Sequence, residues 1–281
     1  MSVLSDRNTI MDWEAIQIRQ LVDYYYDVQK LRISVFNRLI AYIKLRGYNV
    51  LETQEENASQ TSLKKVKVTL KPSEIAKEMT AGKCEVPPDL ETYVWLHNNL
   101  YAIEKEFSKT LDKWSKDHPI RIHFLNRVQG IGGVLASGVI AWLSPISRFP
   151  NISKLWKYCG LAPGQRRVRG QPCGYNPKLK SLMWKIATSF EKQNPEKSFY
   201  RRIYEQKKKY YMEREDIRRR LESGEKGVQP HVRMMTLRYT VKRFLADLWV
   251  QWRKLEGLPI TKPYAHGVLG HTEYIEWQPD K

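Results

Sequence analysis

The sequence has no acidic residue between Asp117 and Glu191, although Asp and Glu together account for 30 of its 281 residues. A solvated protein surface normally mixes both signs of charge. The same stretch holds eleven basic residues, which are Arg121, Arg127, Arg148, Lys154, Lys157, Arg166, Arg167, Arg169, Lys178, Lys180 and Lys185. Cations without intervening anions attract polyanions. We call residues 118–190 the basic window and expect it to bind nucleic acid.

Other absences narrow the class of protein. No run of 18 apolar residues occurs and the first residues lack a signal-peptide pattern, so we expect a soluble, intracellular protein that does not enter a membrane. Three scattered cysteines are too few for a disulfide framework or a four-ligand zinc site. The only close histidine pair, His266 and His271, favours capping or packing, with metal binding as the alternative. We expect no metal and no cofactor.

The overall charge agrees with the basic window. The formal net charge is +18 and the sequence pI is about 9.7. Such values favour nucleic acid as a partner over an anionic membrane surface. A chain of 281 residues is long enough for one large domain or two modest ones, each with a buried core.

A glycine-rich turn lies inside the basic window. The segment 125–140 predicts a short helix, a tight turn at Gly130-Ile131-Gly132, and a second helix that begins near Gly132 or Gly133. Gly130 and Gly132 can adopt positive φ without a Cβ clash. The first N–H groups of the second helix would then point outward and favour phosphate. The pattern is typical of a helix-hairpin-helix, and an ordinary corner between helices is the alternative.

A second candidate is the loop 164–174, which is too rich in Gly and Pro to be regular. Its arginines suit phosphate oxygens, because a guanidinium grips them in pairs. The alternative is an exposed basic loop without a ligand. The predicted nucleic-acid-binding residues of the whole window are Arg127, Gly130, Ile131, Gly132, Gly133, Arg148, Lys154, Arg166, Arg167, Arg169, Lys178 and Lys180.

Hydrophobic periodicity predicts an all-α fold. We expect two long N-terminal helices, over 9–46 and 88–116, that form a coiled-coil-like hairpin, followed by a helix-hairpin-helix domain and C-terminal helices. The predicted regions are 1–118 with a flexible linker at 48–87, a basic domain at 119–193, and a C-terminal helical region and tail at 194–281. Within the linker, 64–71 fits a short strand or a basic arm, and 73–80 a short helix.

The helix at 88–116 predicts an interface. One stripe at near-heptad spacing is formed by Leu96, Leu100, Ile103, Phe107, Leu111 and Trp114. Such a stripe suits a partner helix, either the first long helix or a second copy of the protein. We expect a homodimer through this helix.

The order of motifs resembles a known family. Gly130-Ile131-Gly132 is followed by Arg148-Phe149-Pro150 and by a helix that ends in Gly160-Leu161-Ala162-Pro163. This order resembles the C-terminal domain of transposases of the insertion sequence 110/116/902 family, closely over about 120–190 and more loosely over 88–255. The resemblance implies a DNA-binding helix-hairpin-helix domain preceded by a coiled segment.

The family also implies catalytic groups that are missing here. Its members carry a RuvC-like nuclease domain with four acidic residues, and a nucleophilic serine in the loop that corresponds to 164–174. This loop has no serine, and the nearest hydroxyls are Tyr175 and Ser181. The residues before the turn predict long helices without the βαβ alternation that could mount a nuclease site.

We therefore expect a non-catalytic DNA-binding protein of transposase origin that binds duplex or branched DNA. One alternative is an active transposase or recombinase subunit that needs a nuclease partner in trans. Another is an RNA-binding ribonucleoprotein component, because the related transposases use a structured guide RNA. A structural protein that coats DNA is a further alternative.

Overall fold

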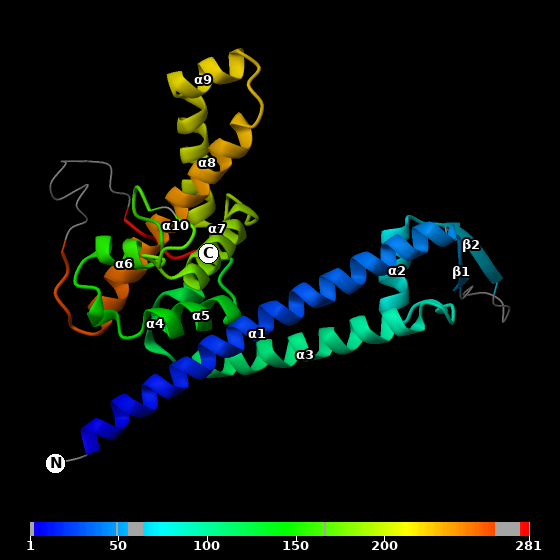
Figure 1. Cartoon of the computed structure of the whole chain (residues 1–281), viewed down its shortest axis with the longest axis horizontal. Coiled ribbons are helices and arrows are strands. Elements are labelled where there is room, and N and C mark those ends of the chain that lie inside the picture. Colours follow the sequence, from blue (N-terminus) through cyan, green and yellow to red (C-terminus); the bar gives the residue numbers. More distant parts are fainter. Residues whose placement is uncertain (1–2, 49, 56–63, 166, 262–275, 281) are drawn as a thin grey trace. The chain divides into compact units, whose positions relative to one another are not determined.

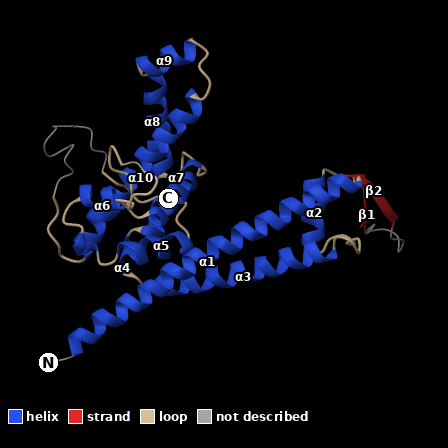
Figure 2. Cartoon of the chain, viewed as in Figure 1, coloured by secondary structure: helices blue, strands red, loops and turns tan. Residues whose placement is uncertain are grey.

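The computed structural model describes residues 3–48, 50–55, 64–165, 167–261 and 276–280. Helices form nearly all of its regular structure, which confirms the predicted all-α class (Figures 1 and 2). The chain divides into two compact units, one formed by 20–110 and the other by 1–19 with 111–281. The elements are α1 (Val3–Arg46), β1 (Val50–Glu55), β2 (Lys64–Thr69), α2 (Pro72–Thr80), α3 (Glu91–Ser115), α4 (Pro119–His123), η1 (Leu125–Arg127), α5 (Gly133–Leu143), η2 (Ile146–Arg148), α6 (Ile152–Tyr158), α7 (Pro177–Glu191), α8 (Phe199–Glu213), α9 (Glu215–Glu222) and α10 (Val228–Leu255).

In the unit 20–110, α1 and α3 pack side by side and antiparallel. Tyr42 stacks near Tyr93 with ring centroids 5.7 Å apart, and Phe36 lies 5.2 Å from the ring of His97. The partner numbers on α3 fall as those on α1 rise, which makes the pair a helical hairpin, as the sequence predicted. An apolar cluster that includes Leu39, Ile43, Ile75, Leu90 and Val94 fastens α2 to the same end of the pair.

The middle of this helical hairpin is polar. Glu104, only 7% exposed, accepts a 2.6 Å bond from Arg32 Nε and a 2.7 Å bond from Gln29 Nε2. Burial by itself would raise the pKa of Glu104, but the hydrogen bonds from Arg32 and Gln29 outweigh it and hold the pKa below its usual value. A satisfied buried carboxylate thus joins the two helices where apolar residues are lacking.

The polar contact explains why the predicted stripe on 88–116 is only partly right. Leu100 and Leu111 are buried as expected, but Ile103 is 44% exposed. The face of α3 that meets α1 passes through His97 and Glu104 instead. A search for apolar periodicity cannot select those two residues, because their burial depends on partners from α1.

Regular structure also occupies part of the segment 48–87, which the sequence predicted to be a linker. β1 pairs with β2 in an antiparallel register that sets Glu52 opposite Lys67 and Glu55 opposite Lys64. The strand at 64–69 and the helix α2 confirm the shorter predictions made inside that segment. β1 was missed because its polar sequence is typical of a loop, and its pairing with β2 is a nonlocal property.

In the other unit, α10 is the central helix. It packs against α6, α7 and α8, and in Figure 1 α8 runs beside it. The core between them is aromatic, with the Phe190 ring 4.8 Å from Tyr200 and 5.3 Å from Phe244. Trp249 of α10, 1% exposed, donates from Nε1 to the carbonyl of Phe149 at 2.8 Å. Many of the aromatic residues therefore serve packing.

Candidate nucleic-acid interface

The predicted glycine turn lies between two short elements, α4 with η1 on one side and α5 on the other. Gly130 has φ +93°, which confirms that this position needs a glycine. Gly132 is the N-cap of α5 with φ −88° and ψ 177°, so the prediction of positive φ there is wrong. Gly132 is exposed, and a Cβ on it would meet nothing within 4 Å. The N-cap of α5 is therefore open to solvent on this side.

The two neighbouring glycines are held by packing. The carbonyl of Gly130 accepts a 2.7 Å bond from Ser189 Oγ of α7, and a Cβ on Gly130 would lie 2.8 Å from that oxygen. A Cβ on Gly133 would lie 2.2 Å from Oδ1 of Asp112. The turn is thus fixed against α7 on one side and against α3 on the other.

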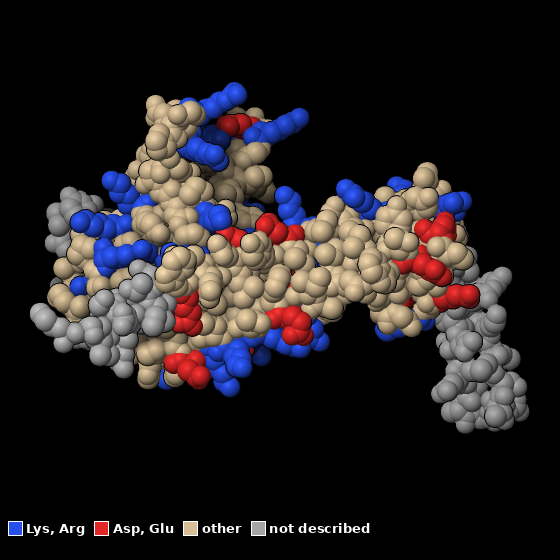
Figure 3. Space-filling view, turned by 60° about the horizontal axis from the view of Figure 1, so that its bottom comes forward, with Lys and Arg blue, Asp and Glu red and all other residues tan. Residues whose placement is uncertain are grey.

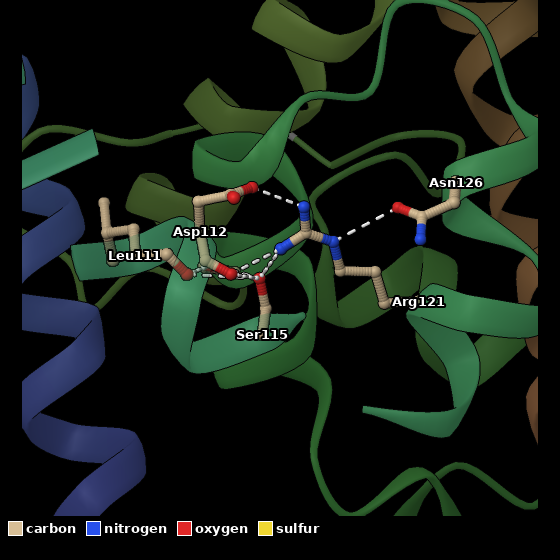
Figure 4. Close-up of polar contacts among 6 residues, drawn as sticks. Leu111, Asp112, Ser115, Arg121 and Asn126 are labelled. Atoms are coloured by element: carbon tan, nitrogen blue, oxygen red, sulfur yellow. Dashed lines mark hydrogen bonds and ion pairs between the residues drawn. The ribbon is translucent and has the colours of Figure 1, made fainter. Parts of the chain in front are cut away.

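Arg121 is a structural residue of the basic window. It is 8% exposed, and its guanidinium pairs with the Asp112 carboxylate and donates to Ser115 Oγ (Figure 4). Its Nε donates to Asn126 Oδ1 at 3.2 Å. A buried guanidinium with these partners fixes α3 to α4. It is not available to an external phosphate.

The segment 276–280 closes another side of the turn. Asp280 accepts a 2.6 Å bond from the N–H of Gln129, and its own N–H donates to the carbonyl of Arg127 at 2.9 Å. The ring of Trp277 lies 4.7 Å from the ring of Phe124. The segment 276–280 therefore packs against the glycine turn and Phe124. The sequence predicted that the tail packs back or binds a partner, but not where it packs.

The loop 164–174, which we call the arginine loop, is held by hydrogen bonds at its two ends. Gln165 Nε2 donates to the carbonyl of Lys157 at 3.1 Å, and Asn176 N–H donates to the carbonyl of Tyr158 at 3.0 Å. Beyond these ties Arg167 and Arg169 are exposed in a segment without helix or strand. Arg166 lies outside the described residues. Arg167 and Arg169 therefore extend into solvent from a loop whose two ends are held by the bonds of Gln165 and Asn176.

The remaining predicted residues differ in accessibility. Lys154 on α6 and Lys178 on α7 are exposed. At the turn, Arg127 is exposed and Ile131 is half-buried. Arg148 is exposed, but its guanidinium lies 4.7 Å from the Phe149 ring and donates to the carbonyl of Trp142. The Nζ of Lys180 lies 4.4 Å above the ring of Tyr175. Arg127, Lys154, Arg167 and Arg169 are the best placed for phosphate.

The helix α10 adds two cations that the sequence did not reveal. Arg238 Nη2 donates to the carbonyls of Leu161 and Ala162 at 3.0 and 2.8 Å, directly before the arginine loop. Burial, aided by the charge of Arg238, lowers the pKa of Lys242, whose Nζ lies 4.1 Å above the Trp156 ring. Both residues are distant in sequence from the window that they extend.

The helix α7 sets the distance between the two candidate surfaces. Asn176 caps its start beside the arginine loop, and Ser189 near its end holds the glycine turn. At 1.5 Å per residue, the thirteen residue steps from Asn176 to Ser189 span about 20 Å. A duplex that touched both surfaces would be contacted over roughly six base-pair steps of 3.4 Å.

Acidic residues from other parts of the sequence reach the window. Asp112 and Asp280 both contact the glycine turn, and Asp112 also pairs with Arg121 of the window. In the view of Figure 3, Lys and Arg groups are set among acidic and uncharged surface and do not form one unbroken patch. Asp112 and Asp280 therefore bring acidic groups to a window whose own sequence has none.

The groups considered for catalysis have structural contacts. Ser181 Oγ donates to the carbonyl of Pro177 at 3.0 Å, and the Tyr175 ring packs against Gly160. Within the described residues no three His, Cys, Asp or Glu side chains gather as metal ligands do. His266 and His271 lie outside the described residues. No helix in the described part of the chain is long and apolar enough to cross a membrane.

One comparison with known proteins matches this region. Residues 122–201, which include the glycine turn, the arginine loop and α7, match the model of the transposase IS116/IS110/IS902 family. The match covers a segment of the chain and confirms the resemblance seen in the motifs. The match also indicates a transposase origin for this segment. No curated protein matches the chain.

Proposed function

We propose that this protein binds nucleic acid through the phosphate backbone, with the glycine turn as a helix-hairpin-helix and the arginine loop as a second contact. The observation that carries the proposal is the open N-cap of α5, where Gly132 is exposed and a Cβ on it would have no neighbour within 4 Å. Amide groups at a helix start favour an anion. Arg127 is exposed three residues before Gly130.

The match to a transposase family makes DNA the first ligand to test. Backbone amides and arginines that contact phosphate do not distinguish one base sequence from another. Duplex and branched DNA are therefore both candidate ligands of this surface. We propose a non-catalytic role, because the arginine loop contains no serine at the place where the resembled family has its nucleophile. Incubation with supercoiled plasmid and Mg²⁺ tests this: nicked or linear product would favour an active recombinase subunit.

The binding experiment uses nuclease-treated protein with fluorescent duplex DNA, a four-way DNA junction and a structured RNA. Fluorescence anisotropy across a salt series gives the slope of log affinity against log salt. We expect roughly −0.9 per phosphate contact on duplex DNA and a total steeper than −3. Tighter binding to the RNA than to either DNA would favour the ribonucleoprotein alternative. Weak binding to all three, with no salt dependence, would refute the proposal.

Two variants separate the surfaces. Gly132→Val is expected to fold, because its φ of −88° suits any residue and the position is open, but the side chain would stand where a phosphate approaches. Arg167→Ala with Arg169→Ala removes two exposed charges from the arginine loop. We expect each to weaken binding by about tenfold or more, and the loop variant to reduce the salt slope by about two contacts. Lys105→Ala on α3, exposed in the other unit, is the control.

We also propose a homodimer through α3. Trp95 and Tyr101 are 64% and 54% exposed, and Ile103 is 44% exposed on the helix predicted to self-associate. Trp95 and Ile103 lie about 80° apart around the helix at 100° per residue, and apolar side chains exposed on one side of a helix favour a protein contact. Sedimentation equilibrium of wild type and Ile103→Glu tests this. A wild-type protein that remains monomeric at micromolar concentration would contradict the dimer.

A further inference from the structure

A cavity of about 380 Å³ lies between α7, α10 and the chain just before the arginine loop. Its walls include Leu161, Lys180, Trp184, Met234, Met235 and Arg238. None of the residues that line it is acidic. Volumes of this size are typical of cavities that hold a small organic ligand. The proposed backbone contacts do not use it.

The mouth of the cavity is apolar and open to water. Trp184 is 49% exposed and Met234 is also 49% exposed. Trp184 is the only Trp, Tyr or Phe of the basic window, within its described residues, whose side chain is exposed. A half-exposed indole forgoes part of the hydrophobic free energy that full burial of its ring would provide. A flat ligand face against this indole would recover it.

Three basic side chains, Lys180, His231 and Arg238, stand in a lining that is otherwise apolar. Arg238 is held by the carbonyls of Leu161 and Ala162 at 3.0 and 2.8 Å. Lys180 lies over the Tyr175 ring at 4.4 Å. His231 of α10 completes this side of the wall. The cavity therefore joins an aromatic face to donors that suit an anion or a carbonyl oxygen.

The cavity adjoins the arginine loop and faces away from the glycine turn. Gly160 and Leu161, which lead into the loop, belong to its lining, and Lys180 follows the loop on α7. The turn contacts α7 through Ser189, five residues after Trp184 and about 140° around the helix at 100° per residue. A strand that crosses the arginine loop therefore reaches the cavity without crossing the turn.

We propose that this cavity binds an unpaired nucleobase of a nucleic acid whose backbone lies on the arginine loop. The inference rests on the proposed function and extends it from backbone binding to recognition of unpaired or distorted sites. A nucleotide combines a flat apolar face with a phosphate, which matches an indole wall beside fixed cations. Apolar side chains of a protein partner would use the indole but leave the basic side chains without a counterpart. Enzymes and binding proteins hold extruded bases by this kind of stacking.

The test compares three DNA duplexes of one sequence: fully paired, with a single-nucleotide bulge that carries 2-aminopurine, and with an abasic bulge at the same place. We expect wild type to bind the 2-aminopurine bulge about 5- to 100-fold more tightly than the other two, with quenched fluorescence, because one base stacks on one aromatic side chain. Trp184→Ala should abolish that preference while keeping the affinity for paired duplex, and Trp184→Phe should keep most of it. Trp13→Ala, exposed on α1, is the matched control.

The outcomes separate this inference from the proposed function. Equal binding of the three duplexes by wild type, or an unchanged preference in Trp184→Ala, overturns the base site but leaves the backbone surface intact. Gly132→Val and the arginine-loop variant should weaken binding to all three duplexes. Absence of binding to any duplex overturns both proposals. Circular dichroism and thermal melting confirm that Trp184→Ala, altered at a half-exposed position, remains folded.

Discussion

The carboxylate of Asp280 joins the backbone N–H of Gln129 to the backbone N–H of Phe199, at 2.6 and 2.5 Å. One side chain thus fastens the glycine turn to the start of α8, two places 70 residues apart in the sequence. An acidic group at a helix start also interacts favourably with the helix dipole. The position of the candidate interface therefore depends on the segment 276–280.

Asp280→Ala should destabilise the protein by about 1–3 kcal/mol, because it leaves two partly buried donors without this acceptor. Thermal denaturation should show a Tm lower by about 2–4 °C for each kcal/mol in a unit of this size. Asp280→Asn keeps an acceptor and should cost less. Glu276→Gln, exposed in the same segment, is the control. An Asp280→Ala protein as stable as wild type would mean that this contact does not hold the turn.

The three glycines of the turn should respond differently to alanine. Gly132→Ala should leave stability within about 0.5 kcal/mol, because the position is open and its φ is ordinary. Gly130→Ala and Gly133→Ala should each cost more than 1 kcal/mol, the first through φ +93° and the second through the side chain of Asp112. Urea denaturation of the three variants measures the order. Equal losses at all three positions would contradict the described turn.

Glu104 predicts a pH dependence for the helical hairpin of α1 and α3. Its folded pKa lies below the usual value, so its contribution to stability is present above the unfolded pKa of about 4.3 and is lost as pH falls through the folded pKa. Glu104→Gln should therefore lower stability by about 2 kcal/mol at pH 7. The difference from wild type should shrink below pH 4. Denaturation at pH 7, 5 and 3 tests this, and a difference independent of pH would contradict it.

The sequence could predict the helices but only part of the interface. Long amphipathic patterns located α1, α3 and α7, and the glycine pattern located the turn that precedes α5. What it could not show is which faces meet. His97 and Glu104 are buried through partners on α1, and the strand β1 exists through pairing with β2. Such contacts join distant residues, so local propensity and periodicity carry no signal for them.

The same limit applies to charge. Counting residues in the basic window treats Arg121 and Arg167 alike, yet Arg121 is buried against Asp112 whereas Arg167 is exposed. Arg238 and Trp184 form part of one cavity although they are distant in the sequence. A charge pattern can therefore identify the class of ligand. Which side chains are accessible to that ligand depends on the folded arrangement.

Asp112 provides the most direct test of the helix start of α5 as a phosphate site. Its carboxylate lies against Gly133 and pairs with Arg121, so a negative charge stands next to the place where a phosphate is proposed to bind. Asp112→Asn removes that charge while it keeps the size of the side chain and an acceptor for Arg121. We expect affinity for duplex DNA to rise about three- to tenfold at moderate salt, with a smaller gain at high salt because surface electrostatics are screened.

Fluorescence anisotropy at two salt concentrations measures the effect, with Glu106→Gln as the control, since Glu106 is an exposed acid of α3 that pairs with Lys109 at 2.6 Å. The control should change affinity less than twofold. The thermal melt of Asp112→Asn should show a modest loss, because Arg121 keeps its bond to Asn126. If the affinity stays the same or falls while the variant is folded, phosphate does not approach the start of α5, and the arginine loop alone carries the proposed binding.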